Sequence, residues 1–147
     1  MRILKSMATS FFALTTLLLI TPSTQAHAKE PAYLHALSDL RSARGWIELD
    51  HRPEGRDARA HAVDEVQRAI DEVKHAAHDE GKETRFTPPA QSGGDPWAPL
   101  RSARRLLDEA RHDVADGHDL PENQGLQDRA LRHIDEAIHT LDRVIHH

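Results

Sequence analysis

The chain has 147 residues, no cysteine, twelve histidines, and 24 Asp and Glu against 19 Lys and Arg, for a formal net charge of −5. An acidic chain of this kind is a poor candidate for binding nucleic acid or an anionic membrane surface. Because cysteine is absent, disulfides and thiolate metal ligands are excluded.

The first 28 residues are predicted to be an export signal. Two basic residues near the start are followed by an apolar run at residues 11–20, which is too short to span a bilayer as a stable anchor. The small-x-small sequence Ala26-His27-Ala28 is typical of a signal peptidase site. We place cleavage after Ala28, with Ala26 as the alternative. The remaining chain, residues 29–147, is predicted to be a single helical domain that is periplasmic or secreted.

The first and third predicted helices, at residues 31–51 and 97–116, share the pentad LRSAR, at residues 40–44 and 100–104. In both copies apolar residues recur at steps of three and four, which is typical of one face of an amphipathic helix. Turn-forming Pro and Gly follow each copy. The two apolar stripes consist of Leu37, Leu40, Ala43 and Ile47 in the first copy, and of Trp97, Leu100, Ala103 and Leu107 in the second.

The second and fourth predicted helices, at residues 57–79 and 123–146, match each other in pattern rather than in letters. Each apolar position of the earlier helix has an apolar counterpart 68 residues later. The linker at residues 80–96 is rich in Pro and Gly and has no helical period. The matched positions are Ala62, Val63, Val66, Ala69, Ile70, Val73, Ala76 and Ala77, with Ala130, Leu131, Ile134, Ala137, Ile138, Leu141, Val144 and Ile145.

These patterns predict an internal duplication of a helical hairpin, with copies at residues 31–79 and 97–146. One hairpin cannot bury its own apolar stripes, whereas two can bury them against each other. We therefore predict an all-α fold, an up-down-up-down four-helix bundle. Arg44 and Arg104 are expected to form salt bridges at the seams of this bundle, with a buried anion site as the alternative. Trp46 lies either on the outer face or, if its helix is slightly rotated, in the core.

The sequence does not predict an enzyme. Glu72–His75 and Glu109–His112 have the Glu-x-x-His spacing of di-iron carboxylate proteins, but their helical phase turns them away from the apolar stripes. The chain also lacks a phosphate-binding loop and a nucleophile motif.

The outward-facing histidines are the strongest candidates for a binding site, and we interpret them as ligands of a divalent metal. In an up-down-up-down bundle the second and fourth helices end at the same pole, which would gather most of these histidines together. Imidazole and carboxylate without sulfur suit Cu(II), Zn(II) or Ni(II). Solvated histidines and a pH-responsive role are the alternatives. The candidate ligands are His35, Asp71, His75, His78, His139, Asp142, His146 and His147.

The stretches AVDEVQRAIDEVKHAAHDEGK and RHIDEAIHTLDRVIHH resemble the repeats of the small metal-binding protein family. That family comprises exported, His-rich, Cys-free four-helix bundles thought to hold copper and other divalent ions in the periplasm. The resemblance covers about a third of the chain, and it implies metal ligands at His133, His139 and His146, with His75 and His78 in the earlier copy. The chain also resembles uncharacterised exported bacterial helical proteins that share the layout HALSDLR…RHIDEAI.

Two functions are therefore expected. The first is a non-enzymatic, exported bundle that binds or buffers Cu(II), Zn or Ni through surface histidines. The alternative is a structural or protein-interaction module of the cell envelope in which the histidines have no metal role.

Overall fold

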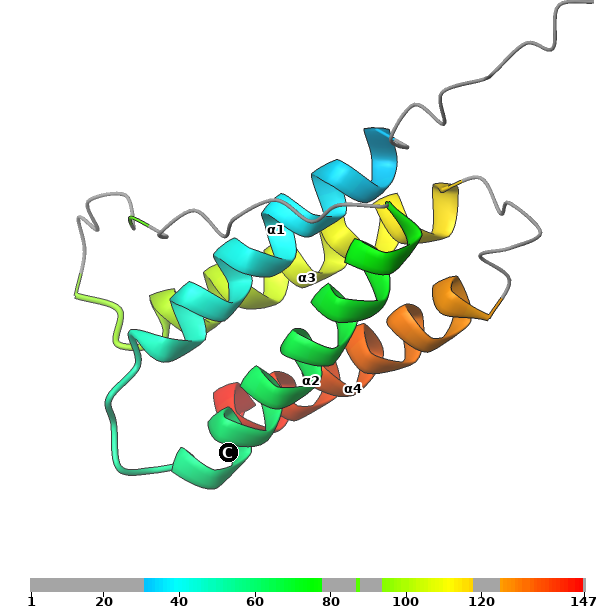
Figure 1. Cartoon of the computed structure of the whole chain (residues 1–147). Helices are drawn as coiled ribbons and strands as arrows, with labels where there is room; N and C mark the ends of the chain where they lie inside the picture. The colour runs from blue at the N-terminus through cyan, green and yellow to red at the C-terminus, as the bar shows by residue number, and fades with distance from the viewer. Residues whose placement is uncertain (1–30, 78–86, 88–93, 118–124, 147) are drawn as a thin grey trace, which may run out of the picture.

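The computed structural model describes residues 31–77, 87, 94–117 and 125–146. These residues form four α-helices: α1 (Pro31–Glu48), α2 (Arg56–Ala76), α3 (Ala98–Asp116) and α4 (Leu126–His146) (Figure 1). No strand occurs within the described ranges. The predicted all-α, four-helix fold is confirmed. The predicted signal at residues 1–28 lies outside the described residues.

Local turn chemistry explains where the helices begin and end. α1 stops at Glu48, three residues before the predicted end, and the chain turns through Pro53 and Gly55 into α2. Gly55 adopts the left-handed conformation with φ 70°, which residues with a side chain rarely do. Before α3, the carboxylate of Asp95 accepts a hydrogen bond of 2.9 Å from the backbone N–H of Trp97 and so holds the entry to the helix.

The most extensive packing joins helices of different hairpins. α1 packs chiefly on α3, and α2 packs chiefly on α4, whereas the two helices within each hairpin contact each other less. Figure 1 shows α1 beside α3 and α2 beside α4. Each hairpin therefore relies on the other for most of its buried helix surface.

All four neighbouring pairs of helices are antiparallel. Glu72 near the end of α2 binds Arg129 near the start of α4, and a Cβ on Gly117, after α3, would meet the ring of Tyr33 at the start of α1. Asp50 after α1 lies near Arg59 in α2, with 3.9 Å between the two charged groups. Since α1 is antiparallel to both α2 and α3, the helices α2 and α3 run in the same direction (Figure 1).

This arrangement differs from the predicted up-down-up-down order, because the direction does not reverse between α2 and α3. About 20 residues separate these two helices. Such a connection reaches about 70 Å when extended, more than twice the roughly 30 Å length of α2, so it can return the chain to the opposite end. Short connections force neighbouring antiparallel helices, whereas long crossovers leave the direction open.

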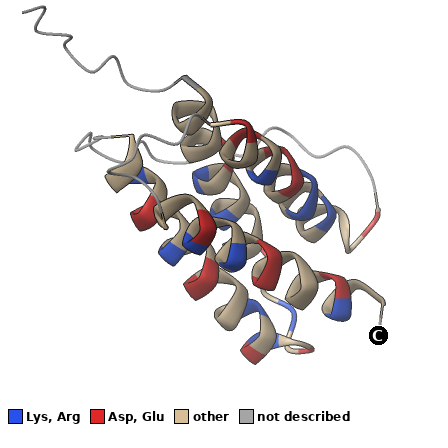
Figure 2. Ribbon diagram, turned by 90° about the vertical axis from the view of Figure 1, so that its right-hand side faces the viewer, with Lys and Arg blue, Asp and Glu red and all other residues tan. Residues whose placement is uncertain are grey.

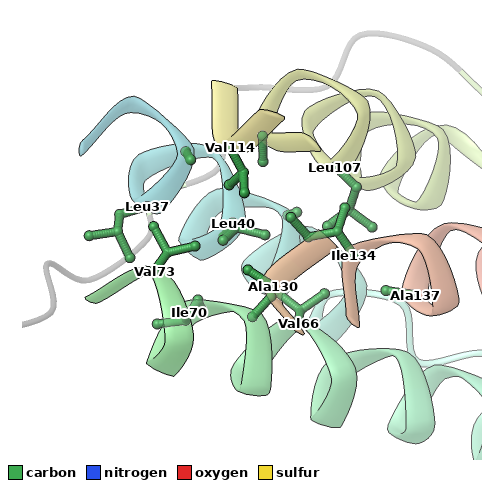
Figure 3. Close-up of a cluster of buried hydrophobic side chains, with 14 of the residues drawn as sticks. Leu37, Leu40, Val66, Ile70, Val73, Leu107, Val114, Ala130, Ile134 and Ala137 are labelled. Atoms are coloured by element: carbon green, nitrogen blue, oxygen red, sulfur yellow. The ribbon is translucent and has the colours of Figure 1, made fainter. Parts of the chain in front are cut away.

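The apolar stripes read from the sequence form the core, to which all four helices contribute (Figure 3). Every predicted stripe residue of α1 is at most 1% exposed, while Trp97, the first member of the α3 stripe, is half-buried. Trp46 is 6% exposed, so the alternative in which its helix turns it into the core is the correct one. Alanine is frequent here, and a helix face lined by Ala permits a close approach between axes. The fully buried alanines are Ala36, Ala43, Ala62, Ala69, Ala103, Ala110 and Ala137.

One close contact requires a glycine between α3 and α1. A Cβ placed on Gly117 would lie 2.7 Å from two ring carbons of Tyr33. Tyr33 is 1% exposed, so its ring is enclosed and cannot move aside without disturbing the core. By contrast, a Cβ on Gly94 would meet no atom within 4 Å.

We therefore expect Gly117→Ala to lower the free energy of unfolding by about 1–3 kcal/mol through overpacking against Tyr33. Gly94→Ala serves as the matched control and should leave stability nearly unchanged. Urea denaturation followed by circular dichroism measures both. Equal midpoints for the two variants would contradict the close contact.

Candidate functional site

The histidine pole predicted from the sequence is divided between the two ends of the bundle. His35, in the first turns of α1, and His75, in the last turn of α2, are exposed at one end. His146 is exposed at the end of α4, which lies at the opposite end because α4 is antiparallel to α2. His78 and His147 lie outside the described residues. The expectation of a shared pole was wrong because it depended on alternating helix directions.

The other candidate metal ligands are either far apart along a helix or already hydrogen-bonded to another side chain. His139 and His146 are both exposed on α4, but a spacing of seven residues places them about 10 Å apart along the axis. Asp142 accepts a hydrogen bond of 3.0 Å from Arg104, and Asp71 accepts one of 3.0 Å from Gln67. Within the described ranges, no three His, Asp or Glu side chains are grouped so that they could hold a metal ion.

The two Glu-x-x-His pairs lie on the surface, as their helical phase predicted. Glu72 binds Arg129 with distances of 2.8 and 3.0 Å, and His75 is exposed. In the second pair, Glu109 accepts a hydrogen bond of 2.5 Å from Arg105, and His112 lies 3.2 Å from Asp116. Neither pair faces the interior of the bundle.

The paired arginines of the repeated pentad occupy seams between helices and form ion pairs there, as predicted. Arg104 contacts Asp108 on its own helix and Asp142 on α4. Arg44 lies 3.7 Å from Glu48 and also donates a hydrogen bond to Gln67 on α2. Basic and acidic residues are interspersed on the helices, which favours such local pairs (Figure 2).

The most organised polar cluster was not predicted from the sequence, and it lies at the turn between α1 and α2. Arg52 donates two hydrogen bonds, of 2.8 and 2.5 Å, to the two carboxylate oxygens of Asp50. Its guanidinium also lies 3.5 Å from the ring centroid of Trp97, a cation–π contact that joins this turn to the start of α3. Arg59 donates hydrogen bonds to the backbone carbonyls of Glu54 and Arg52, which satisfies acceptors within the turn.

The ion pair changes the acidity of its members. The hydrogen bond from Arg52 lowers the pKa of Asp50 from its usual value and outweighs the opposing effect of burial. The same hydrogen bond raises the pKa of Arg52. Asp50 is thus held ionised, and its side chain is only 3% exposed. The run HRPEGRDAR at residues 51–59 was the available sequence signal, since it places three arginines within nine residues, across the turn and the first residues of α2.

Two open grooves lie at this end of the bundle. The first has a volume of about 400 Å³ between the end of α1 and the start of α2. The second has a volume of about 290 Å³ between the start of α3 and the end of α4. We call this end, with both grooves, the Arg-rich end. Its basic lining residues are His51, Arg52, Arg56 and Arg59 in the first groove, and Arg101, Arg104, Arg105 and His146 in the second.

Midway along α1, Asp39 lies among other carboxylates. Burial raises the pKa of Asp39 on α1, and the nearby carboxylates Glu109 and Asp113 on α3 raise it further. Arg105 and His35 act in the other direction but do not cancel the shift.

No protein family, curated protein or solved structure matched this chain in the comparisons. Among the described helices, none combines the length and the apolar character needed to cross a membrane.

Replacing Asp50 or Asp39 by the neutral Asn should change the free energy of unfolding in opposite directions. At pH 7 we expect Asp50→Asn to lower the free energy of unfolding by about 1–3 kcal/mol, because it removes charged hydrogen bonds. Asp39→Asn should raise it, because the ionised carboxylate is disfavoured there in the folded protein.

The pH dependence separates the two effects. The gain from Asp39→Asn should vanish first as the pH falls, since the pKa of Asp39 is raised. The deficit of Asp50→Asn should persist to lower pH, because the lowered pKa keeps Asp50 ionised. Urea denaturation of both variants and the parent between pH 7 and pH 3 measures this order. A destabilised Asp39→Asn at pH 7 would contradict the assignment.

Proposed function

We propose that the protein is an exported, non-enzymatic interaction module that binds an acidic segment of a partner protein at its Arg-rich end. The observation that carries this proposal is the pair of grooves at one end of an otherwise acidic molecule, lined by six arginines and two histidines. Arginine presents a planar set of donors that matches carboxylates in a bidentate manner. It is also enriched at protein interfaces.

The first groove combines basic groups with apolar lining. Arg56, in the first turn of α2, is exposed, and Ile47, Ala60 and Val63 line the groove beside it. Arg52 and Arg59 are held in place by Asp50, Trp97 and the turn carbonyls, so little side-chain freedom remains to be lost on binding. This combination suits a peptide that offers both a carboxylate and a small apolar side chain.

The second groove lies between α3 and α4 at the same end of the bundle. Arg101 and Arg105 are exposed there and form ion pairs with Asp95 and Glu109. Arg104 is engaged with Asp108 and Asp142. Glu48 and Asp50 in the first groove, together with Asp108 and Asp142 in the second, reduce the local positive charge. We therefore expect moderate affinity that decreases with ionic strength.

A fluorescent oligo-glutamate peptide tests the proposal with the mature chain at low salt. We expect Arg56→Glu to weaken binding by about tenfold or more, because it replaces an attractive charge in the groove by a repulsive one. Arg132→Glu is the matched control. It changes the net charge equally at an exposed site in the first half of α4, which lies away from the Arg-rich end. Fluorescence anisotropy measures both affinities. No binding by the parent, or equal losses in the two variants, would overturn the proposal.

Metal binding by the surface histidines is the second candidate function. It is favoured by the exposure of His75 and His146 in the last turns of α2 and α4, where a further histidine follows each in sequence, at His78 and His147. Because these two helix ends lie at opposite ends of the bundle, any Cu(II), Zn(II) or Ni(II) would occupy two independent sites rather than one shared pole.

Isothermal titration of the mature, tag-free protein with Ni(II) tests this candidate. His75→Gln with His78→Gln should remove one site, and His146→Gln with His147→Gln should remove the other, with additive effects because the sites are far apart. Affinity should decrease below about pH 6, since protonated imidazole cannot bind metal. Loss of all binding in either double variant would instead indicate a shared site, and absence of binding by the parent would remove this candidate.

A further inference from the structure

The contact between Glu65 and His133 stands out among the polar contacts of the bundle. Glu65, on α2, is only 5% exposed although it carries a carboxylate. Its Oε2 lies 2.6 Å from Nδ1 of His133 on α4, and its Oε1 accepts a hydrogen bond of 2.9 Å from Arg68. The pair therefore sits at the junction between the two hairpins, largely removed from solvent.

The positions of these two residues are equivalent in the repeated sequence. They are 68 residues apart, which is the offset that matches the apolar pattern of α2 to that of α4. In two antiparallel helices, equivalent positions can touch only where an approximate two-fold axis passes between them. As such an axis requires, a residue after Glu65 in α2 contacts a residue before His133 in α4, as Glu72 does with Arg129. A residue before Glu65 contacts one after His133, as His61 does with Glu136.

This location makes the pair sensitive to which hairpins associate. If the first hairpin paired with a second copy of itself, Glu65 would face another Glu65 in a largely buried position. If the second hairpin paired with itself, His133 would face His133. Two carboxylates in one buried site repel each other, and only the unlike pairing joins a carboxylate to an imidazole.

We propose that Glu65 and His133 form a selectivity pair that directs each hairpin to associate with the complementary hairpin rather than with a copy of itself. The matched apolar positions of α2 and α4 are alike and do not by themselves distinguish self from complement. The selectivity pair supplies this distinction at the one point where the symmetry of the bundle brings equivalent residues together. A single charged position that specifies the partner in this way is a known device in helical assemblies.

The proposal also defines the surface by which two copies of the chain can interact. The connection between α2 and α3 is long, so a hairpin can associate with the complementary hairpin of a second copy as well as with its own. In both cases the partner presented to Glu65 is His133. Exchange between copies therefore preserves the pair, whereas self-pairing of one hairpin breaks it.

A double-mutant cycle on the full mature chain tests the selectivity pair at pH 7. Glu65→His and His133→Glu should each raise the equilibrium constant for unfolding by about a hundredfold, because each leaves like groups facing at a buried position. The combined exchange E65H with H133E should recover part of this loss, because it again joins a carboxylate to an imidazole at this point, although Arg68 then no longer meets a carboxylate at position 65. Urea denaturation followed by circular dichroism measures all four proteins.

The matched control exchanges the same residue types at the exposed contact between His61 and Glu136, whose side chains are each 47% exposed. H61E with E136H, and the two single variants, should change stability little, since exposed ion pairs contribute little. If Glu65→His or His133→Glu fails to fold, the exchanged protein still decides the question. A combined exchange no more stable than the weaker single variant would overturn the proposal.

Partner choice is measured directly by cutting the folded chain. A protease site is placed in the connection between α2 and α3, and the cut protein is unfolded in urea, refolded by dilution and analysed by native mass spectrometry. The parent should reform complexes of one first half with one second half. In His133→Glu this preference should be lost, and in the combined exchange it should return. Equal amounts of like and unlike complexes from the parent, or an unchanged preference in His133→Glu, would overturn the proposal.

Discussion

The close packing of alanine-lined helix faces between the two hairpins is the constraint on which the rest of the structure depends. α1 lies against α3 and α2 lies against α4 more extensively than either hairpin packs within itself. Fully buried alanines occur on all four helices, including Ala137 on α4. Small residues allow helix axes to approach, but they bury little area each. The bundle therefore gains its core only when both hairpins are present.

This packing has a direct consequence for the position of repeated residues. Because corresponding helices are antiparallel, a residue near the end of α2 and its counterpart near the end of α4 lie at opposite ends of the molecule. For this reason His75, near the end of α2, and His146, near the end of α4, are separated by the length of the bundle. Only residues close to the centre of the two helices, such as Glu65 and His133, can meet their counterparts.

Most arginines on the surface form ion pairs with nearby carboxylates. Arg104, Arg111 and Arg129 each bind a carboxylate on a neighbouring helix. Exposed pairs of this kind add little stability individually, but they occupy the acidic residues that metal coordination would need. The Arg-rich end differs because its arginines outnumber the carboxylates in the grooves, and because Asp50 and Trp97 hold Arg52 in a defined orientation.

The sequence by itself determined the local structure and the buried faces. The four helices end within about three residues of the predicted bounds wherever those bounds are described, and the stripe Leu37, Leu40, Ala43 and Ile47 is buried as predicted. Helical period and turn residues act over a few positions, so they can be read from the chain directly. The outward phase of Glu72 and His75 could be predicted for the same reason.

Only the tertiary structure decided the direction of α3 relative to α2, the separation of His75 from His146, and the contact between Glu65 and His133. Amphipathic stripes specify which face of a helix is buried, but they are satisfied equally by either direction of the neighbouring hairpin. With a long connection between α2 and α3, the chain imposes no direction of its own, and the choice rests on side-chain packing and charge pairing across the interface. These are contacts between residues distant in sequence, and no local pattern contains them.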